Sequence, residues 1–502
     1  MRIFRGLLAS LHELDLIIIY VQKKETEMKH KLTAGVAAVP MFGKKAGRKA
    51  PSTGSEDGQK DVQSGTRTRL ALIVLLTIAI FSPSALRAQL VVDCSGANPN
   101  AFPSINSALA AVPGPGATIL VSGVCTEDVA LNNQLNLNLG AWWGTTATLH
   151  GHLSINTSES VYLYGLNVTN ASGNGVDVVS GRGITLDTFT STGNSGIGLS
   201  LGNTSDVNVI GPAAFDNNSS YGIDLFTNSM LTFGTWNGSP IEINNNKNAG
   251  LYLSQASFTT FGNTYIIGNA SSAAGTPAFG LTQFGGSRVQ IGTCSGPNAI
   301  EQNQSGGISV VEHSEITLWS CNQGFRSTVQ NNGAVGISVG FGSQVTIYDD
   351  VDIIGHAGPG IDIYSNGQLY FFGQNVVSQN GVPGDPRSAA IRLDGNSQAF
   401  MRGGQIASNL GVGILALVNS SADFTGLTFS GNSAGTITCD TSSWMASDLP
   451  THSGVYGPGV SCRTPHTLGP RSFAPTKPPV PDFSLQKKRQ AQYKATATPK
   501  SH

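Results

Sequence analysis

Charged residues are scarce in this chain of 502 residues, at 12% of the total. The few basic ones avoid the middle: residues 89–464 contain 8 Lys and Arg against 22 Asp and Glu. A surface that binds nucleic acid needs clustered Lys and Arg to neutralise the phosphates. The sequence therefore predicts that nucleic acid is not a partner of this acidic region.

Zinc-binding motifs and long apolar runs are also missing. The six cysteines form no CxxC pattern and no Cys/His cluster of the kind that binds zinc. An even number of cysteines in a weakly charged chain favours disulfides and an oxidising compartment. The most apolar run, residues 70–81, is too short to span a bilayer. We expect no transmembrane span in the mature chain.

That apolar run has the pattern of a signal peptide. Arg67 and Arg69 precede it, and a segment rich in Ser, Pro and Ala follows it up to Ala88. We predict a signal peptide at 67–88 and export to the extracellular space, the periplasm or the cell surface. Residues 1–66 are then a disordered extension, or they lie upstream of a true start at Met28 or Met41.

A short pattern recurs between Gly175 and Gly435: an Asn-rich corner, a small residue, and then alternating apolar residues. Eleven such anchors are 21–30 residues apart. Apolar residues stand one, three and eleven positions after the anchor, and serine often stands at the seventh. The serines that we place at this position are Ser229, Ser257, Ser287, Ser314, Ser343, Ser397 and Ser420. Each repeat therefore holds two strands of period two around a fixed corner.

Repeats of this length indicate a solenoid. We predict an all-β domain at residues 89–464, a single-stranded parallel β-helix of about 11–13 coils stacked at about 4.8 Å. Asn suits the left-handed backbone of a tight corner, and Asn side chains on successive coils hydrogen-bond one another. Residues 465–502 are rich in Pro and basic residues, which predicts a disordered tail.

The cysteines provide a test of this register. Cys294 and Cys321 each stand fourteen residues after an anchor, so they lie on neighbouring coils at the same position. Their Cα atoms are then about one rung apart, within the roughly 4.4–6.8 Å range of a disulfide. The predicted pairs are Cys94–Cys125, Cys294–Cys321 and Cys439–Cys462, the first and last of which would close the two ends.

An amphipathic helix is predicted ahead of the coils, with Ile105, Ala108, Leu109 and Val112 on one face, where it covers the open end of the solenoid. The stretch that follows has a Gly-x-x-x-Glu corner from Gly123 to Glu127. It resembles the opening of pectin lyase-like proteins, which include pectate lyases, pectin methylesterases and polygalacturonases. The resemblance covers roughly residues 91–462 in fold, and it implies a right-handed β-helix with an N-terminal capping helix.

The catalytic patterns of those enzymes are not found, and one stretch that resembles them has another interpretation. In "YDDVDIIGHAGPG", residues 348–360, His356 stands where other repeats place a corner Asn, and no Arg-x-Lys follows. Asp349, Asp350 and Asp352 are candidate Ca²⁺ ligands because Ca²⁺ binds clustered oxygen atoms. A solvated loop is the alternative for these three acids.

Outward-facing columns offer two further candidates. Asp362 and Arg392 become neighbours on adjacent coils, with Asp394 two residues further along. They form either a surface ion pair worth about 0–1 kcal/mol, or a glycosidase-type site. In the second case Asp362 and Asp394 are acid and base, and Arg392 binds a carboxylate of the substrate.

Aromatic residues follow one another on a second outward surface. Its members are Trp319, Tyr348, Phe372 and Arg402 in one column and Tyr370 and Phe400 in the next. Rings stepped by about 4.8 Å match the pitch of a sugar chain. The alternative is that the rings stabilise one another across the strands.

We interpret the chain as an exported protein whose partner is a polysaccharide or cell-envelope glycan bound on these rings. The missing catalytic patterns favour a non-catalytic surface or scaffold protein. The alternative is a polysaccharide lyase or glycoside hydrolase of the pectin lyase-like superfamily.

Overall fold

The computed structural model describes residues 89–447, except 113, 144, 146, 235–237, 270–278, 322–323 and 386, and it also describes Cys462. The chain divides into two units, Met1–Ser82 and Pro83–His502, and every described residue belongs to the second. The predicted extension, signal peptide and tail lie outside the described residues. Within the described part of the chain, no helix is long and apolar enough to cross a membrane.

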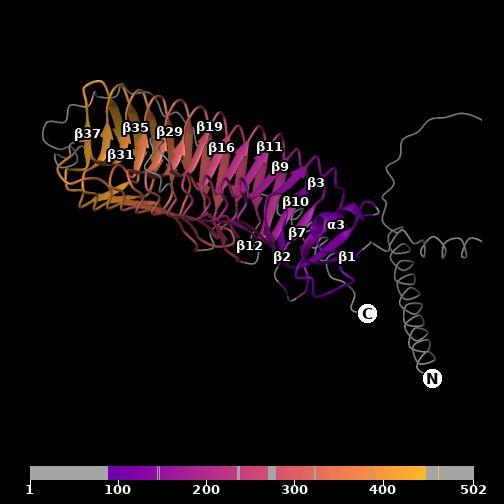
Figure 1. Ribbon diagram of the computed structural model, residues 1–502. Helices are drawn as coiled ribbons and strands as arrows, with labels where there is room; N and C mark the ends of the chain where they lie inside the picture. The colour runs from indigo at the N-terminus through magenta and orange to yellow at the C-terminus, as the bar shows by residue number, and fades with distance from the viewer. Residues whose placement is uncertain are drawn as a thin grey trace, which may run out of the picture. The chain divides into compact units, whose positions relative to one another are not determined.

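Short parallel strands stack coil on coil and form three faces (Figure 1). The first face is a sheet of 13 strands in chain order: β3 (Val129–Asn132), β6 (Leu153–Asn156), β9 (Val176–Val179), β11 (Leu199–Gly202), β13 (Ile223–Phe226), β16 (Leu251–Ser254), β19 (Phe279–Phe284), β22 (Gly306–Val310), β25 (Val335–Val339), β28 (Ile361–Ile363), β31 (Ala389–Leu393), β34 (Val412–Ala416) and β37 (Ile437–Cys439).

The other two faces belong to one sheet of 25 strands, because three long strands run around the bend between them. These are β2 (Thr118–Thr126), β10 (Ile184–Thr192) and β12 (Asp206–Ala214). The second face also contains β1 (Gln89–Asp93), β4 (Asn138–Ala141), β7 (Tyr162–Tyr164), β14 (Met230–Phe233), β17 (Ser257–Thr260), β20 (Arg288–Gly292), β23 (Glu315–Trp319), β26 (Gln344–Ile347), β29 (Gln368–Phe372), β32 (Gln398–Arg402), β35 (Ser421–Thr425) and β38 (Trp444–Ser447). The third face also contains β5 (Ala147–His150), β8 (Leu166–Thr169), β15 (Ile241–Glu242), β18 (Thr264–Ile267), β21 (Asn298–Glu301), β24 (Ser327–Gln330), β27 (Val351–Ile354), β30 (Val376–Ser378), β33 (Gln405–Ala407) and β36 (Thr428–Ser430).

Each coil therefore has three strands rather than the two predicted. The third strand lies in the segment that the sequence pattern treats as a connection of variable length. It is short, as in β15 with two residues and β30 with three. Three or four residues are too few for alternation to be distinguished from a loop, which is why the pattern did not reveal this face.

The predicted interior is confirmed. The first and third residues after the anchors are fully buried on successive coils, as for Ile337 and Val339 of β25 and Ile361 and Ile363 of β28. Phe233, Phe258 and Phe371 of the second face also lie inside. One continuous core runs along the stack, so every coil loses apolar surface to its neighbours on both sides.

A ladder of side chains, all buried except the last, which is half-buried, follows the corner before the first face. Nine asparagines and one histidine form it: Asn194, Asn218, Asn246, Asn269, Asn303, Asn332, His356, Asn380, Asn409 and Asn432. The backbone N–H of Asn303, for example, donates to Oδ1 of Asn332 at 3.0 Å, and its Nδ2 donates to the same oxygen at 2.9 Å. The left-handed backbone falls on the residue before each ladder position, such as Asn331 with φ 51°. The sequence predicts that one Asn has both the left-handed backbone and the hydrogen bonds between coils. In the structure these two features belong to neighbouring residues.

His356 occupies the ladder position that the sequence assigned to it. Its ring is 1% exposed, Nδ1 accepts from the N–H of Asn332 at 3.2 Å, and Nε2 donates to the carbonyl oxygen of Val329 at 3.0 Å. This pattern requires a neutral ring, because Nδ1 must keep its lone pair. Burial lowers the pKa of His356 to about 4.

Serines form a second ladder at the corner between the first and second faces. The N–H of Ser287 donates to Oγ of Ser314 at 3.2 Å, and the N–H of Ser314 donates to Oγ of Ser343 at 3.1 Å. The prediction is wrong for Ser257, because Met230 pairs with it and Ala256 takes the ladder position. The corner between the first and second faces is one residue shorter in that coil.

The first coils are closed by helix α3 (Ile105–Ala110), which packs against β1, β2 and β3. Ile105 and Ala108 are fully buried, as predicted for a capping helix. Ser104 is the N-cap and receives the N–H of Ser107. All three predicted disulfides are present, and the Cα atoms of Cys294 and Cys321 are 4.9 Å apart. The in-register stacking inferred from the cysteines is confirmed.

Candidate functional site

The aromatic residues predicted to form a surface come together on the outward side of the second face. Strand pairing places Tyr370 beside Phe400 and Phe372 beside Arg402 on β29 and β32. The rings of Tyr348 and Phe372 are stacked, with centroids 5.5 Å apart and an angle of 23° between their planes. Phe372 also lies 6.4 Å from Tyr370 and 6.0 Å from Phe400. We call Tyr348, Tyr370, Phe372 and Phe400 the aromatic strip.

Trp319 stands in the predicted column but is buried, with 6% exposed. Its strand neighbour on the preceding coil is Gly292. A Cβ atom on that glycine would lie 2.7 Å from the indole ring, so the ring occupies the space above Gly292. Trp319 therefore supports the end of the strip and does not present a ring face to solvent, whereas the four strip residues are half-buried.

Arg402 closes the other end of the strip. Its guanidinium carbon lies 3.7 Å from the centroid of Phe400, a cation–π contact. Nη2 donates to Oδ2 of Asp423 at 3.0 Å, and Nη1 donates to Oδ1 at 3.3 Å. These two hydrogen bonds hold the guanidinium against the ring, and the carboxylate of Asp423 neutralises the charge of Arg402.

Asp362 and Arg392 are neighbours on β28 and β31, as predicted. Arg392 donates to both oxygens of Asp362, from Nε at 2.7 Å and from Nη2 at 2.6 Å. Burial raises the pKa of Asp362, and the hydrogen bond from Arg392 opposes that rise. Arg392 uses its Nε and Nη2 donors on Asp362, so these donors are not available to a carboxylate of the substrate. The two residues act as an ion pair in the structure. Asp394 places a second negative charge near both members of this pair, a like charge for Asp362 and an opposite one for Arg392.

The three candidate calcium ligands are not gathered into one group. Among the described residues, the carboxylates of Asp349, Asp350 and Asp352 do not all lie within 4.8 Å of one another. Arg326 donates to Asp350 at 3.0 Å and to Asp352 from Nε at 2.7 Å. Asp349 instead accepts from the N–H of Gln374 at 3.1 Å. Arg326 thus places a positive charge beside Asp350 and Asp352.

The comparisons with known proteins agree with this architecture. Residues 307–449 match the family model of the right-handed beta helix region. The fold is a right-handed parallel β-helix.

A search by sequence among curated proteins found no match. Among solved structures, the A-module of mannuronan C-5 epimerase AlgE4 from Azotobacter vinelandii is similar, with 15% identity and a TM-score of 0.38, over 72% of this chain and 92% of that chain. The catalytic unit of a GH87 alpha-1,3-glucanase from Streptomyces thermodiastaticus has 12% identity and a TM-score of 0.32, over 76% of this chain and 70% of that chain.

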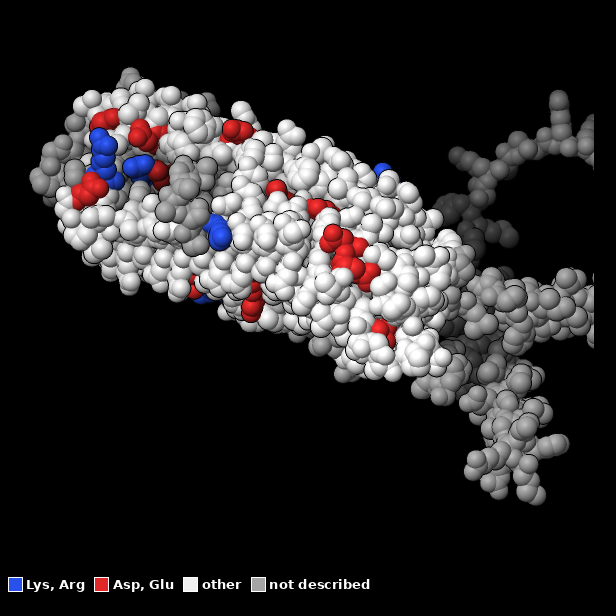
Figure 2. Space-filling view, in the orientation of Figure 1, with Lys and Arg blue, Asp and Glu red and all other residues white. Residues whose placement is uncertain are grey.

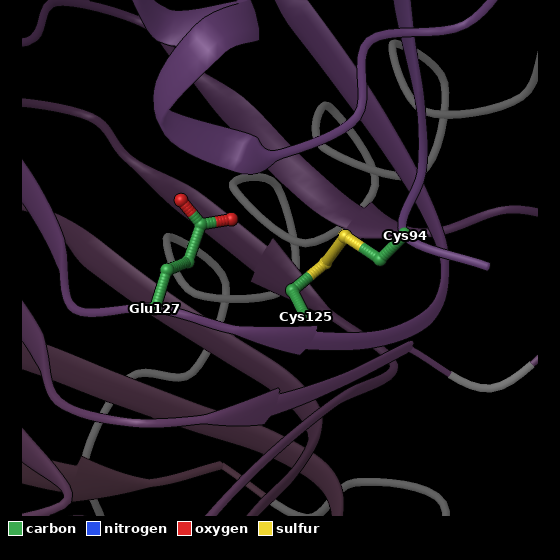
Figure 3. A group of neighbouring side chains, drawn as sticks. All are labelled: Cys94, Cys125 and Glu127. Carbon is green, nitrogen blue, oxygen red and sulfur yellow. A yellow bond between two sulfur atoms is a disulfide. The ribbon is translucent and has the colours of Figure 1, made fainter. Parts of the chain in front are cut away.

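One group in the β-helix has the composition of a metal site but another role. The side chains of Cys94, Cys125 and Glu127 lie together beside α3 (Figure 3). The two cysteines are joined in a disulfide, which removes the thiolates that a metal would bind. The Glu127 carboxylate accepts the N–H groups of Ile105 at 2.7 Å and Asn106 at 3.2 Å. The Gly-x-x-x-Glu corner therefore caps the helix.

The face of the β-helix seen in Figure 2 is mostly uncharged. Basic and acidic side chains lie side by side near the end that Figure 1 labels β31–β37. A shallow cleft of about 370 Å³ lies elsewhere, between β8, β10 and β15, with Asn167, Thr190 and Glu242 among its lining residues. It is separate from the aromatic strip.

The sequence interpretation missed a polar cluster on the first face. Nε2 of His152 lies 2.9 Å from Oδ2 of Asp177, and Asp224 stands two coils further along the same outward column. His152 precedes the first recognised repeat, so nothing in the pattern assigned it a position. The repeat pattern also offers Gly196 as an anchor, but Leu199 pairs with Ile223, so the anchor in the structure is Gly198, two residues later. Counting from Gly196 places Gly198, instead of Ser200, in the outward column beside Asp177.

Proposed function

We propose that this chain is an exported protein that binds a polysaccharide along the aromatic strip. The observation that carries the proposal is the run of neighbouring rings of Tyr348, Phe372 and Phe400 on three successive coils of an outward face. The first two rings are stacked, and the ring of Phe400 is tilted by 59° from that of Phe372. Sugar rings present C–H faces that pack on aromatic rings, and the step of about 4.8 Å between coils is close to the rise of an extended sugar chain. The three disulfides support export, because such bonds persist in oxidising compartments.

A neutral glycan suits this surface better than an acidic one. Residues 89–464 carry a strong excess of Asp and Glu. The one guanidinium at the strip, that of Arg402, is already paired with Asp423. The acidic residues 89–464 would repel a polyanion, and Arg402 is not free to bind one. We therefore propose a neutral polysaccharide or cell-envelope glycan as the partner.

The strip is proposed as a binding surface without catalytic groups of its own. Burial raises the pKa of Tyr348 above its ordinary value, so this phenol is not ionised near neutral pH. Beside the strip, Asp423 is paired with Arg402 and Asp349 accepts the N–H of Gln374. On the first face, Asp362 is paired with Arg392. This favours a surface or scaffold role for the strip over the alternative of a lyase or glycosidase centre at Asp362, Arg392 and Asp394.

Affinity electrophoresis through gels that contain neutral polysaccharides tests this proposal. We expect the triple variant Tyr348→Ala, Phe372→Ala, Phe400→Ala to lose retention, with the apparent Kd at least about tenfold weaker. Phe341→Ala is the matched control, because this ring is 54% exposed but lies at a corner outside the strip. Equal retention of the triple variant and the wild type would refute the strip as the binding surface.

A further inference from the structure

The cleft of about 370 Å³ lies on the outward side of the third face. Its volume is within the roughly 300–1,000 Å³ range of small-molecule sites. Four of its lining residues form one outward column on successive coils, because Asn167 of β8 pairs with Thr190 of β10, Thr190 with Ala214 of β12, and Ala214 with Glu242 of β15. At about 4.8 Å per coil, this column is roughly 14 Å long.

The cleft lies along a bend in strand β12. The strands β10 and β12 pair in register up to Ile210 and then shift, so that Gly211 and Pro212 stand opposite a single residue of β10, Thr188. An extra residue of this kind bends the strand and interrupts the hydrogen-bond ladder. Gly211 has a φ of 76°, and a Cβ atom there would lie 2.7 Å from Oδ1 of Asp187, so this bend requires glycine. Both Pro212 and Thr188 line the cleft.

The floor of the cleft carries groups that suit sugar hydroxyls. Oγ1 of Thr190 donates to Oδ1 of Asn167 at 2.8 Å. This bond uses the oxygen of the amide, and among the described residues Nδ2 of Asn167 has no acceptor. The hydroxyl oxygen of Thr190 can accept a further hydrogen bond. A hydroxyl group both donates and accepts, so it matches this pair of side chains.

Glu242 is the only carboxylate among the described residues that line the cleft, and none of those residues is Lys or Arg. The Glu242 side chain is half-buried, and no described residue donates a hydrogen bond to its carboxylate. The neighbouring carboxylate of Asp187 is engaged, because it accepts the hydroxyl groups of Tyr162 and Thr188. The cleft therefore presents one carboxylate that is available to a ligand.

A second acid adds to the negative charge beside Glu242. Asp216 stands two residues after Ala214, on the same side of the strand, and its Oδ1 accepts the N–H of Asn244 at 2.6 Å. Burial raises the pKa of Asp216 to about 6, and the charge of Glu242 adds to that rise. A cation that approaches two carboxylates relieves their repulsion. The acidic residues 89–464 attract a cation as well.

Exposed tryptophans stand in the loop that forms one edge of the cleft. This loop joins β4 to β5 and supplies Thr145 to the lining. Thr145 donates to the carbonyl oxygen of Trp142, from its N–H at 3.0 Å and from its hydroxyl at 2.8 Å. Trp142 is 37% exposed and Trp143 is 62% exposed. An indole ring attracts cations more strongly than the other aromatic side chains do, so this edge also suits a cationic ligand.

We propose that the cleft binds a short oligosaccharide whose sugars carry free amines. An ammonium group binds Glu242, and sugar hydroxyls bind Asn167 and Thr190. An uncharged sugar would leave the Glu242 carboxylate without a donor, and a simple amine would leave the amide of Asn167 without an acceptor. A column of roughly 14 Å at about 4.8 Å per step has room for about three sugar units. The site is separate from the aromatic strip, so the proposal stands whether or not the strip binds a polysaccharide.

Isothermal titration calorimetry on the full secreted chain tests the proposal at about pH 6.5, where most of the sugar amines are protonated. The ligands are a trimer of β-1,4-linked glucosamine, its fully N-acetylated form, and putrescine, which has amines but no hydroxyls. The glucosamine trimer should bind at least about tenfold more tightly than either of the others. No binding of this trimer would overturn the proposal. Equal affinity for the N-acetylated trimer or for putrescine would also overturn it, because the cleft would then not recognise amine and hydroxyls together.

The variant Glu242→Gln removes the charge and keeps the size of the side chain. Its affinity for the glucosamine trimer should fall at least about tenfold, and its unfolding midpoint should be no lower than that of the wild type, because repulsion with Asp216 is relieved. Asn167→Ala should weaken the trimer by about three- to tenfold and leave the affinity for putrescine unchanged. Glu159→Gln is the matched control, since it alters an exposed carboxylate at another corner. Unchanged affinity of Glu242→Gln would contradict the proposed site.

The failure of this proposal and the failure of the aromatic strip can be told apart. The triple variant Tyr348→Ala, Phe372→Ala, Phe400→Ala should bind the glucosamine trimer as tightly as the wild type does. Glu242→Gln should keep its retention in gels that contain neutral polysaccharides. If the triple variant instead loses the trimer, the strip is the site of this ligand and the assignment to the cleft is wrong.

Discussion

Replacing Asn303 with Ala should lower the free energy of unfolding by about 4 kcal/mol, because several buried polar groups then lose their partners at about 1–3 kcal/mol each. The Asn303 side chain is fully buried. Its Oδ1 accepts the N–H of Asn269 at 2.9 Å and Nδ2 of the same residue at 3.1 Å. Its Nδ2 donates to the carbonyl oxygen of Ile266 at 3.0 Å and to Oδ1 of Asn332.

Chemical denaturation of the purified chain measures this loss. The matched control is Asn132→Ala, which removes an exposed Asn that accepts a hydrogen bond from Asn156. That change should alter the free energy of unfolding by no more than about 0.5 kcal/mol. Equal losses in the two variants would mean that the buried ladder contributes no more than a surface pair, which would contradict the structure.

Acidification should destabilise the protein through His356. Burial holds the pKa of this residue at about 4 in the folded protein, against an ordinary value of 6.5. The unfolded chain therefore binds the proton more readily than the folded one. The stability contributed by the neutral ring is complete above pH 6.5 and is lost as the pH falls toward 4. The loss should reach about 3 kcal/mol, since one pKa unit corresponds to about 1.4 kcal/mol.

The variant His356→Asn isolates this effect. Asn is the residue that the other rungs of the ladder use, and it does not titrate. Unfolding midpoints of both proteins should be measured at several values between pH 7 and pH 4. The wild type should lose more stability than the variant across this window. Parallel curves would show that His356 is not buried in a neutral form.

Much of the fold follows from the sequence because in-register stacking repeats the same physical requirement on every coil. Apolar residues must face inward at fixed positions, and a corner residue must supply hydrogen bonds to its neighbours. These constraints made the core, the Cys294–Cys321 pair and the corner role of His356 predictable. The third face was not predictable, because strands of two to four residues carry too little alternation.

The sites were less predictable because an error of one or two residues in the strand register changes which side chains are neighbours. The aromatic strip was found where the anchors were correct, but the burial of Trp319 depends on the absence of a side chain at Gly292 one coil away. The first-face cluster was missed where the anchor was two residues early and where His152 precedes the recognised repeats. A search that paired coils by their buried asparagines, starting from Asn194, would have placed Ser200 beside Asp177.

Mapping the disulfides by mass spectrometry of a digest without reducing agent tests the vertical alignment of the coils, on which both proposed surfaces depend. We expect linked peptides that join Cys294 to Cys321, Cys94 to Cys125 and Cys439 to Cys462. A free thiol at Cys294, or a peptide that joins it to any cysteine other than Cys321, would contradict the alignment and remove the basis for both surfaces.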